Sequence, residues 1–164
     1  MKVKISHIIQ AMIHYNKADP QRVHHALKVY AFAKSIGELE SLDERTMEIL
    51  ELAAVLHDIG IRNSEQKYGS SSGKYQELEG PPVAKEMLES SDVPLDLIER
   101  VCFLIGHHHT YTQIDGLDYQ IFVEADFLVN LYEDSMTELQ AQTVLQKYFK
   151  TETGKGYLTA MYLK

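Results

Sequence analysis

The spacing of apolar residues constrains this chain most, because through much of the sequence it repeats with the period of an α-helix. Apolar side chains recur every three or four positions from residue 3 to residue 15, as on one face of a helix. Alternating apolar and polar residues, which are typical of half-buried strands, are nearly absent. The 164 residues suit one compact domain. The sequence therefore predicts an all-α fold, with residues 1–164 forming a single-domain bundle of about six to eight helices.

Capping signals predict where several of these helices begin. Asp19 followed by Pro20 predicts a helix that runs to Gly37. Ser41 and Ser135 each begin an S-x-x-E capping box, which predicts one helix ending near residue 60 and another in the last third of the chain. The other expected helices open at 81–82, near 92–94 and at 117, with room for a short one in 151–164.

Two segments without clear periodicity are expected to be loops, residues 61–78 and 109–116. The first is rich in Ser, Gly, Lys and Gln and is about 18 residues long. Loops of this length in compact domains are usually functional or mobile. We therefore expect it to act as a partial lid over a site.

Charge and cysteine content exclude some classes of function. The formal net charge of −8 disfavours nucleic acid and anionic membranes as partners. The single cysteine, Cys102, allows no disulfide within the chain, which favours a reducing compartment. It is read as a small buried hydrophobe, with a nucleophile as the alternative. No apolar run reaches the roughly 20 residues that span a bilayer, and no signal peptide is apparent, so we expect a cytoplasmic protein.

Helical periodicity places three histidines and an aspartate on apolar faces. His25, His57 and His108 each fall in line with apolar residues of their own helix, and Asp126 does so on a fourth. The apolar residues in these stripes are Val29, Phe32 and Ile36 with His25; Met47, Leu50 and Ala54 with His57; Leu97, Val101 and Leu104 with His108; and Phe122 and Val129 with Asp126.

Several inward imidazoles and carboxylates together favour a metal site. A single buried histidine is commonly a hydrogen-bonded core residue, but a buried carboxylate needs compensation, which a divalent cation supplies. His57 and Asp58 lie side by side at a helix C-terminus, where the helix dipole also favours a cation. Gly60 is expected to take the left-handed conformation that ends this helix.

These residues resemble the HD superfamily of metal-dependent phosphohydrolases. "RVHHALKVYAFA", "LAAVLHDIG" and "FVEADFL" are similar to its three elements, over about residues 20–130. The first selects His25 over His24, because Arg22 matches an arginine that the family has three residues before its histidine. The resemblance implies an HD-domain-like fold and a metal held by His25, His57, Asp58 and Asp126.

Some branches of this superfamily bind a second metal, and the matching positions here are less regular. "LIGHHHTY" is similar to a His-His pair of those branches and makes His107 and His108 candidates, with His109 nearby. Where those branches have a further histidine, this chain has Glu79, either a ligand or a helix N-terminal carboxylate. The second site is left open, with one or two divalent ions per chain, each Mn, Fe, Ni, Zn, Co or Mg.

The resemblance implies hydrolysis of a phosphate ester or anhydride in a small molecule, with a nucleotide as the first choice. Catalytic roles fall to Asp58, His107 and His108. Arg62, Lys67 and His109 are candidates for binding substrate phosphate, with a solvent-exposed side chain as the alternative for Arg62.

Two alternative functions would use the same metal site. One is oxygen-dependent oxidation by two irons, and the other is a nucleotide or metal sensor without turnover. The expected partner is a small phosphorylated substrate, with no nucleic acid and no membrane. The apolar faces of the first and last helices are compatible with a homodimer.

Overall fold

The computed structural model describes residues 3–164, and this part of the chain forms nine α-helices and no strand. The all-α prediction is confirmed. The helices are α1 (Ile5–Tyr15), α2 (Pro20–Leu39), α3 (Glu44–Leu56), α4 (Ile61–Tyr68), α5 (Gly73–Ser90), α6 (Leu95–Ile105), α7 (Leu117–Glu133), α8 (Glu138–Tyr148) and α9 (Glu152–Tyr162).

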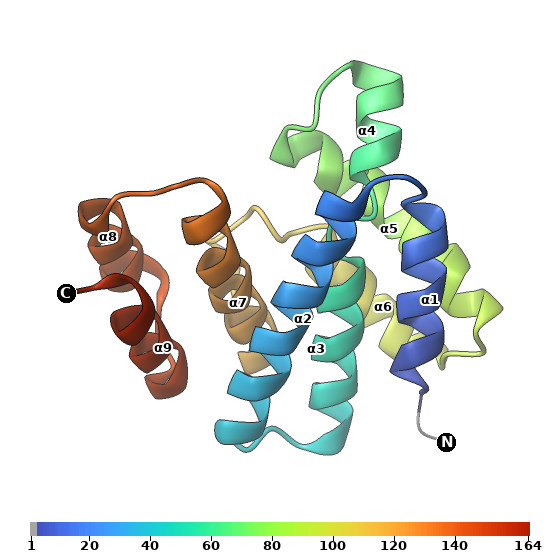
Figure 1. The fold of residues 1–164 in the computed structure, drawn as a ribbon. Coiled ribbons are helices and arrows are strands. Elements are labelled where there is room, and N and C mark those ends of the chain that lie inside the picture. Colours follow the sequence, from blue (N-terminus) through green and yellow to red (C-terminus); the bar gives the residue numbers. More distant parts are fainter. Residues whose placement is uncertain (1–2) are drawn as a thin grey trace.

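The centre of the molecule is a layer made by α2, α3 and α7 (Figure 1). α3 is buried from Ile49 to Leu56 without a break, and α7 is nearly as enclosed. α1, α5 and α6 lie on the α3 side of this layer, whereas α8 and α9 lie beyond α7 (Figure 1). Polar side chains that α2, α3 and α7 turn inward are therefore held in the best-packed part of the fold.

The helix starts confirm some capping predictions and correct others. Asp19 caps α2, where its side chain accepts the backbone N–H of Arg22, and Pro20 is the first helical residue. The predicted caps at Ser41 and Ser135 are wrong, because both residues have a left-handed backbone, with φ of 59° and 49°. The caps lie two residues later, at 43 and 137, where their side chains accept backbone N–H groups of the first turn.

The predicted loop over residues 61–78 is wrong. Residues 61–68 form α4, and α5 begins at residue 73 and not at the proline pair 81–82, which lies inside the helix. Contacts between the two helices hold this region, including the ring of Tyr68 stacked on that of Tyr75 at 4.1 Å. The second predicted loop, 109–116, is confirmed.

A buried carboxylate docks the C-terminal helices on α7. Glu124 is fully buried and accepts the Gln120 amide, the backbone N–H groups of Lys150 and Thr151, and the Thr151 hydroxyl. Within residues 3–164, no helix has the length and apolar character required to cross a membrane.

Candidate metal centre

Four side chains from three helical segments converge in the central layer. Nε2 of His25 lies 3.0 Å from Nε2 of His57, 3.2 Å from Oδ2 of Asp58 and 3.3 Å from Oδ1 of Asp126. Nε2 of His57 lies 3.4 Å from each of the same two carboxylate oxygens. His57 is fully buried, and His25 and Asp126 are only 8% and 7% exposed. The structure thus brings together all four residues predicted for the first metal.

The hydrogen bonds of the two imidazoles leave the Nε2 atom of each ring without a proton, so that it presents a lone pair. Nδ1 of His57 lies 2.8 Å from the Ala54 carbonyl oxygen, and Nδ1 of His25 lies 2.7 Å from Oε1 of Glu133. Both partners only accept hydrogen bonds, so each Nδ1 donates and each neutral ring has a bare Nε2. Two lone pairs 3.0 Å apart repel each other unless a cation or a proton lies at their meeting point.

Asp126 adds an independent sign that this set of atoms fits a cation. Its Oδ1 atom is buried and accepts no hydrogen bond from any group in residues 3–164. A buried acceptor without a donor costs on the order of 1–3 kcal/mol. Two imidazole nitrogens and two carboxylate oxygens are ligands that several divalent transition metals accept. The residues therefore fit the metal that the sequence implies.

Electrostatics at the site couple the rings to the carboxylates. Burial disfavours the charged form of His57, but Asp58 and Asp126 outweigh this and raise its pKa well above 6.5. Burial likewise opposes ionisation of the carboxylates, yet neighbouring imidazoles, His57 among them, hold the pKa values of Asp58 and Asp126 below 3.8. Without a metal, the carboxylates are charged and draw protons onto the histidines.

A second group of ligand atoms lies near Oδ1 of Asp58, the carboxylate oxygen that does not face His25. Oδ1 of Asp58 is 3.4 Å from Nε2 of His108, and ligand atoms of Asp58, His108 and His109 lie within 4.8 Å of one another. Oε1 of Gln76 lies 3.2 Å from Nε2 of His108 and 2.8 Å from Nε2 of His109. Asp58 therefore connects the two groups.

Two residues predicted for the second metal are not brought to this group. Glu79 is paired with Lys67, whose Nζ lies 2.8 Å from Oε1, and accepts the Tyr68 hydroxyl. His107 donates from Nδ1 to the Phe103 carbonyl oxygen and stacks on the Phe103 ring. Because α5 begins earlier than predicted, Gln76, one turn before Glu79, is the residue of this helix that meets the histidines.

The predicted phosphate-binding side chains have other contacts. Nη1 of Arg62 donates to the Tyr15 carbonyl oxygen at the end of α1, and Lys67 is engaged by Glu79. Burial and the neighbouring His108 lower the pKa of His109 to about 4. His109 is therefore neutral at physiological pH and offers a substrate hydrogen bonds but no positive charge.

The turn after Asp58 is built around a close backbone contact. Gly60 was expected to be left-handed, but its φ is −80° and its ψ is −11°. A Cβ at this position would lie 2.4 Å from the backbone nitrogen of Gly80 and 2.9 Å from the carbonyl oxygen of Gln76. Glycine is required here because α5 crosses the chain closely, and this crossing brings Gln76 to the histidines.

Sequence reasoning missed Gln76 and Glu133. Glu133 follows Asp126 by seven residues on α7, two helical turns along the same face, so extending the stripe could have found it. Gln76 had no comparable signal, since it lay within the segment interpreted as a loop.

The fold and the site together define a helical bundle with a buried imidazole and carboxylate centre suited to a divalent metal. A family model described as HD domain matches residues 22–147, more than half of the chain. The chain belongs to the HD domain family. Family membership and the centre together support the general class of a metal-dependent hydrolase.

A solved structure is similar over most of the chain. It is the crystal structure of a protein from an uncultured Thermotogales bacterium, described as a predicted HD superfamily hydrolase. The two share 24% identity with a TM-score of 0.66, over 93% of this chain and 82% of the other. This likeness confirms the fold. Comparison with curated proteins gave no match.

Proposed function

We propose that this protein is a metal-dependent phosphohydrolase that cleaves a phosphate ester or anhydride in a small molecule, with a nucleotide as the first choice. The observation that carries the proposal is the convergence of His25, His57, Asp58 and Asp126 on one buried point, with Oδ1 of Asp126 unpaired within residues 3–164. Membership of the HD domain family supports it, as does the resemblance to HD phosphohydrolases.

These four residues would hold one divalent ion. Such an ion lowers the pKa of a bound water toward neutrality and polarises a phosphoryl oxygen. The chain contributes orientation, because the Nδ1 hydrogen bonds of His25 and His57 fix the direction of each ring. It also contributes a dry environment, since His57 is fully buried under the ring of Phe122, 5.5 Å away.

His108 is the residue best placed to move a proton. Its Nδ1 donates to the Ile105 carbonyl oxygen, so only Nε2 can exchange a proton with a substrate. Nε2 faces Oδ1 of Asp58 and Oε1 of Gln76, and both atoms are acceptors that would hold a proton there. In this role His108 would protonate the leaving oxygen of the substrate.

A two-metal form is a second candidate, because each oxygen of Asp58 faces a different group. Oδ2 lies against His25 and Oδ1 lies against His108. In such a form Asp58 would help to hold both ions, and His108 and His109 would be the further residues that hold the second. Two irons in such a site would support oxidation in place of hydrolysis.

Replacing Asp58 tests the proposal. We expect Asp58→Ala to lose both metal retention and phosphate release, because it removes a ligand atom from each group. Metal content is measured by elemental analysis, and phosphate release on a panel of nucleotides. Asp115→Ala is the matched control, because Asp115 pairs with Arg100 at the surface, and it should behave as the wild type.

The same measurements separate the alternatives. Full turnover by the metal-free Asp58→Ala protein would contradict the mechanism. Two irons per chain with oxygen consumption would favour oxidation. Ligand-induced stabilisation without phosphate release from any compound in the panel would favour a sensor.

A further inference from the structure

His25 differs from the other inward histidines in the partner of its Nδ1 atom. His57 and His108 follow the ends of α3 and α6, and each donates to a carbonyl oxygen in the last turn of the preceding helix, that of Ala54 or Ile105. Carbonyl oxygens in the last turn have no acceptor role in the helix itself and are available to such side chains. His25 lies inside α2, where carbonyl oxygens already accept backbone N–H groups, so its Nδ1 needs an acceptor from another element.

Glu133 at the end of α7 provides this acceptor. Its Oε1 lies 2.7 Å from Nδ1 of His25, and its Oε2 lies 2.5 Å from Nζ of Lys28. His25 and Lys28 are one turn apart on α2, so one helix engages both oxygens of the carboxylate. The ion pair with Lys28 and the hydrogen bond from His25 both favour the carboxylate form of Glu133.

Both nitrogens of the His25 ring thus lie beside carboxylates of the same helix, α7. Asp126 and Glu133 are two turns apart on α7, with Oδ1 of Asp126 3.3 Å from Nε2 and Oε1 of Glu133 2.7 Å from Nδ1. Any rotation of the ring would lengthen at least one of these contacts. Glu133 holds the ring through the hydrogen bond at Nδ1, and Nε2 is left facing Oδ1 of Asp126, an acceptor that a shared cation would join to it.

We propose that Glu133, held in place by Lys28, is a positioning residue for metal binding at His25. Its carboxylate keeps the proton on Nδ1, aims Nε2 at the metal and makes Nε2 a stronger ligand than a neutral partner would. This inference rests on the proposed function, because it assumes that His25 binds a metal.

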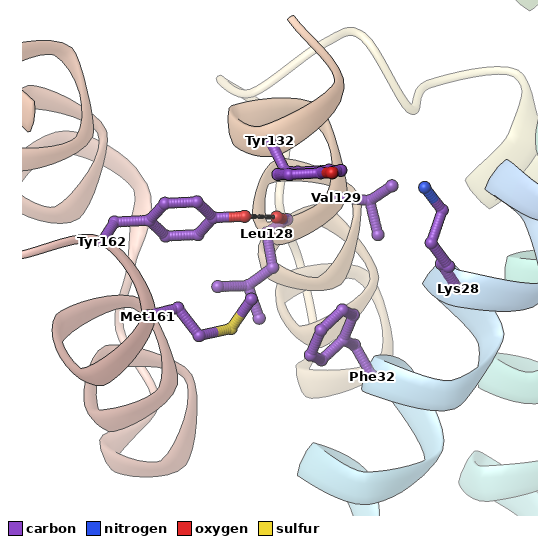
Figure 2. A pocket seen from close by; sticks show the side chains of 7 residues that line it. All are labelled: Lys28, Phe32, Leu128, Val129, Tyr132, Met161 and Tyr162. Carbon is purple, nitrogen blue, oxygen red and sulfur yellow. Dashed lines mark hydrogen bonds between the residues drawn. The ribbon is translucent and has the colours of Figure 1, made fainter. Parts of the chain in front are cut away.

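Lys28 also lines a surface pocket, and another residue of that pocket can be replaced as a control for the Lys28 variants. The pocket has a volume of about 340 Å³ and is otherwise lined by apolar and aromatic side chains from α2, α7 and α9. Figure 2 shows the ammonium group of Lys28 at one side of this pocket, with Met161 across from it. Met161→Leu changes the pocket wall and leaves the ion pair intact.

Metal affinity is the first test, measured by calorimetric titration of metal-free protein with Mn²⁺. Glu133→Gln should bind roughly 10-fold more weakly, because its amide lacks the charge and places an NH₂ group beside Lys28. Lys28→Met should lower the affinity for Mn²⁺ a few-fold, and Lys28→Arg should restore the wild-type affinity. Met161→Leu should match the wild type. Thermal unfolding in chelator checks that each variant is folded.

The His25 tautomer is the second test, and a merely structural role would leave it unchanged. Nitrogen NMR of the metal-free protein, at a pH high enough to make the His25 ring neutral, should show the proton on Nδ1 in the wild type and a shift toward Nε2 in Glu133→Gln. An unchanged tautomer together with Mn²⁺ affinity within about twofold of wild type would overturn the inference while leaving the proposed function intact. A wild-type protein that binds no Mn²⁺ would contradict both.

Discussion

At the scale of single residues, the site is defined by which nitrogen of each ring carries a proton. Carbonyl and carboxylate acceptors hold the Nδ1 protons of His25, His57 and His108. Each Nε2 is then directed at the carboxylate oxygens of Asp58 or Asp126. A cation competes with protons for these atoms, and this competition has a measurable pH dependence.

Metal affinity is expected to rise with pH across the neutral range. Although burial opposes it, Asp58 and Asp126 raise the pKa of His57 well above 6.5, so an incoming cation must displace a proton. Calorimetric titration with Mn²⁺ in buffers of different ionisation enthalpy should detect release of on the order of one proton per ion. Affinity that stays constant from about pH 6 to about pH 8 would contradict this expectation.

The same raised pKa predicts how the metal-free protein responds to pH. In the unfolded chain the pKa of His57 is 6.5, and in the folded protein it is higher. Stabilisation by the His57 imidazolium is therefore fully present below pH 6.5 and is lost as pH rises through the pKa of the folded protein. Protein in chelator should therefore lose thermal stability with rising pH in that window.

Residues whose position follows from one helix could be predicted, and those that depend on contacts between helices could not. The face of α2 that carries His25 and the face of α7 that carries Asp126 are set by the local helical period. Gln76 meets His108 and His109 across 32 and 33 residues of sequence, and Glu133 meets His25 across 108. Those pairings depend on how the helices pack, which no local pattern encodes.

At the scale of elements, the close contact between Gly60 and α5 positions the second group of ligand atoms, because it brings α5 to His108 and His109. The polar composition of 61–78 hid α4, because this short helix has apolar side chains only at its two ends, those of Ile61 and Tyr68, and is held by contacts with α5. The proline pair in α5 predicts a helix start, since proline is favoured in a first turn. Here the preceding turns are held by α4, so the helix passes through both prolines.

Gly60→Ala should destabilise the protein by about 2 kcal/mol or more, since the new Cβ would meet the backbone of Gly80, which cannot rotate away. It should also weaken any binding that depends on Gln76. Urea denaturation measures the free energy of unfolding. Gly156→Ala in α9 is the matched control, because its Cβ would meet nothing within 4 Å, and it should be neutral or slightly stabilising. Equal stability of the two variants would argue against the close crossing.

At the scale of the whole molecule, the metal centre joins helices that are distant in sequence. α2, α3 and α7 contribute the first set of ligand atoms, and α5 and the end of α6 contribute the second group. α8 and α9 lie on the far side of α7 (Figure 1), where Glu124 docks them, and α9 contributes to the wall of the pocket beside Lys28. Metal bound at this centre would cross-link the central layer of the fold.

The most direct test of the metal centre is anomalous X-ray scattering from crystals grown with Mn²⁺. We expect a peak within coordination distance of Nε2 of His25, Nε2 of His57 and one oxygen each of Asp58 and Asp126. A peak elsewhere in the molecule, or none at this position with Mn²⁺ in excess, would contradict the account.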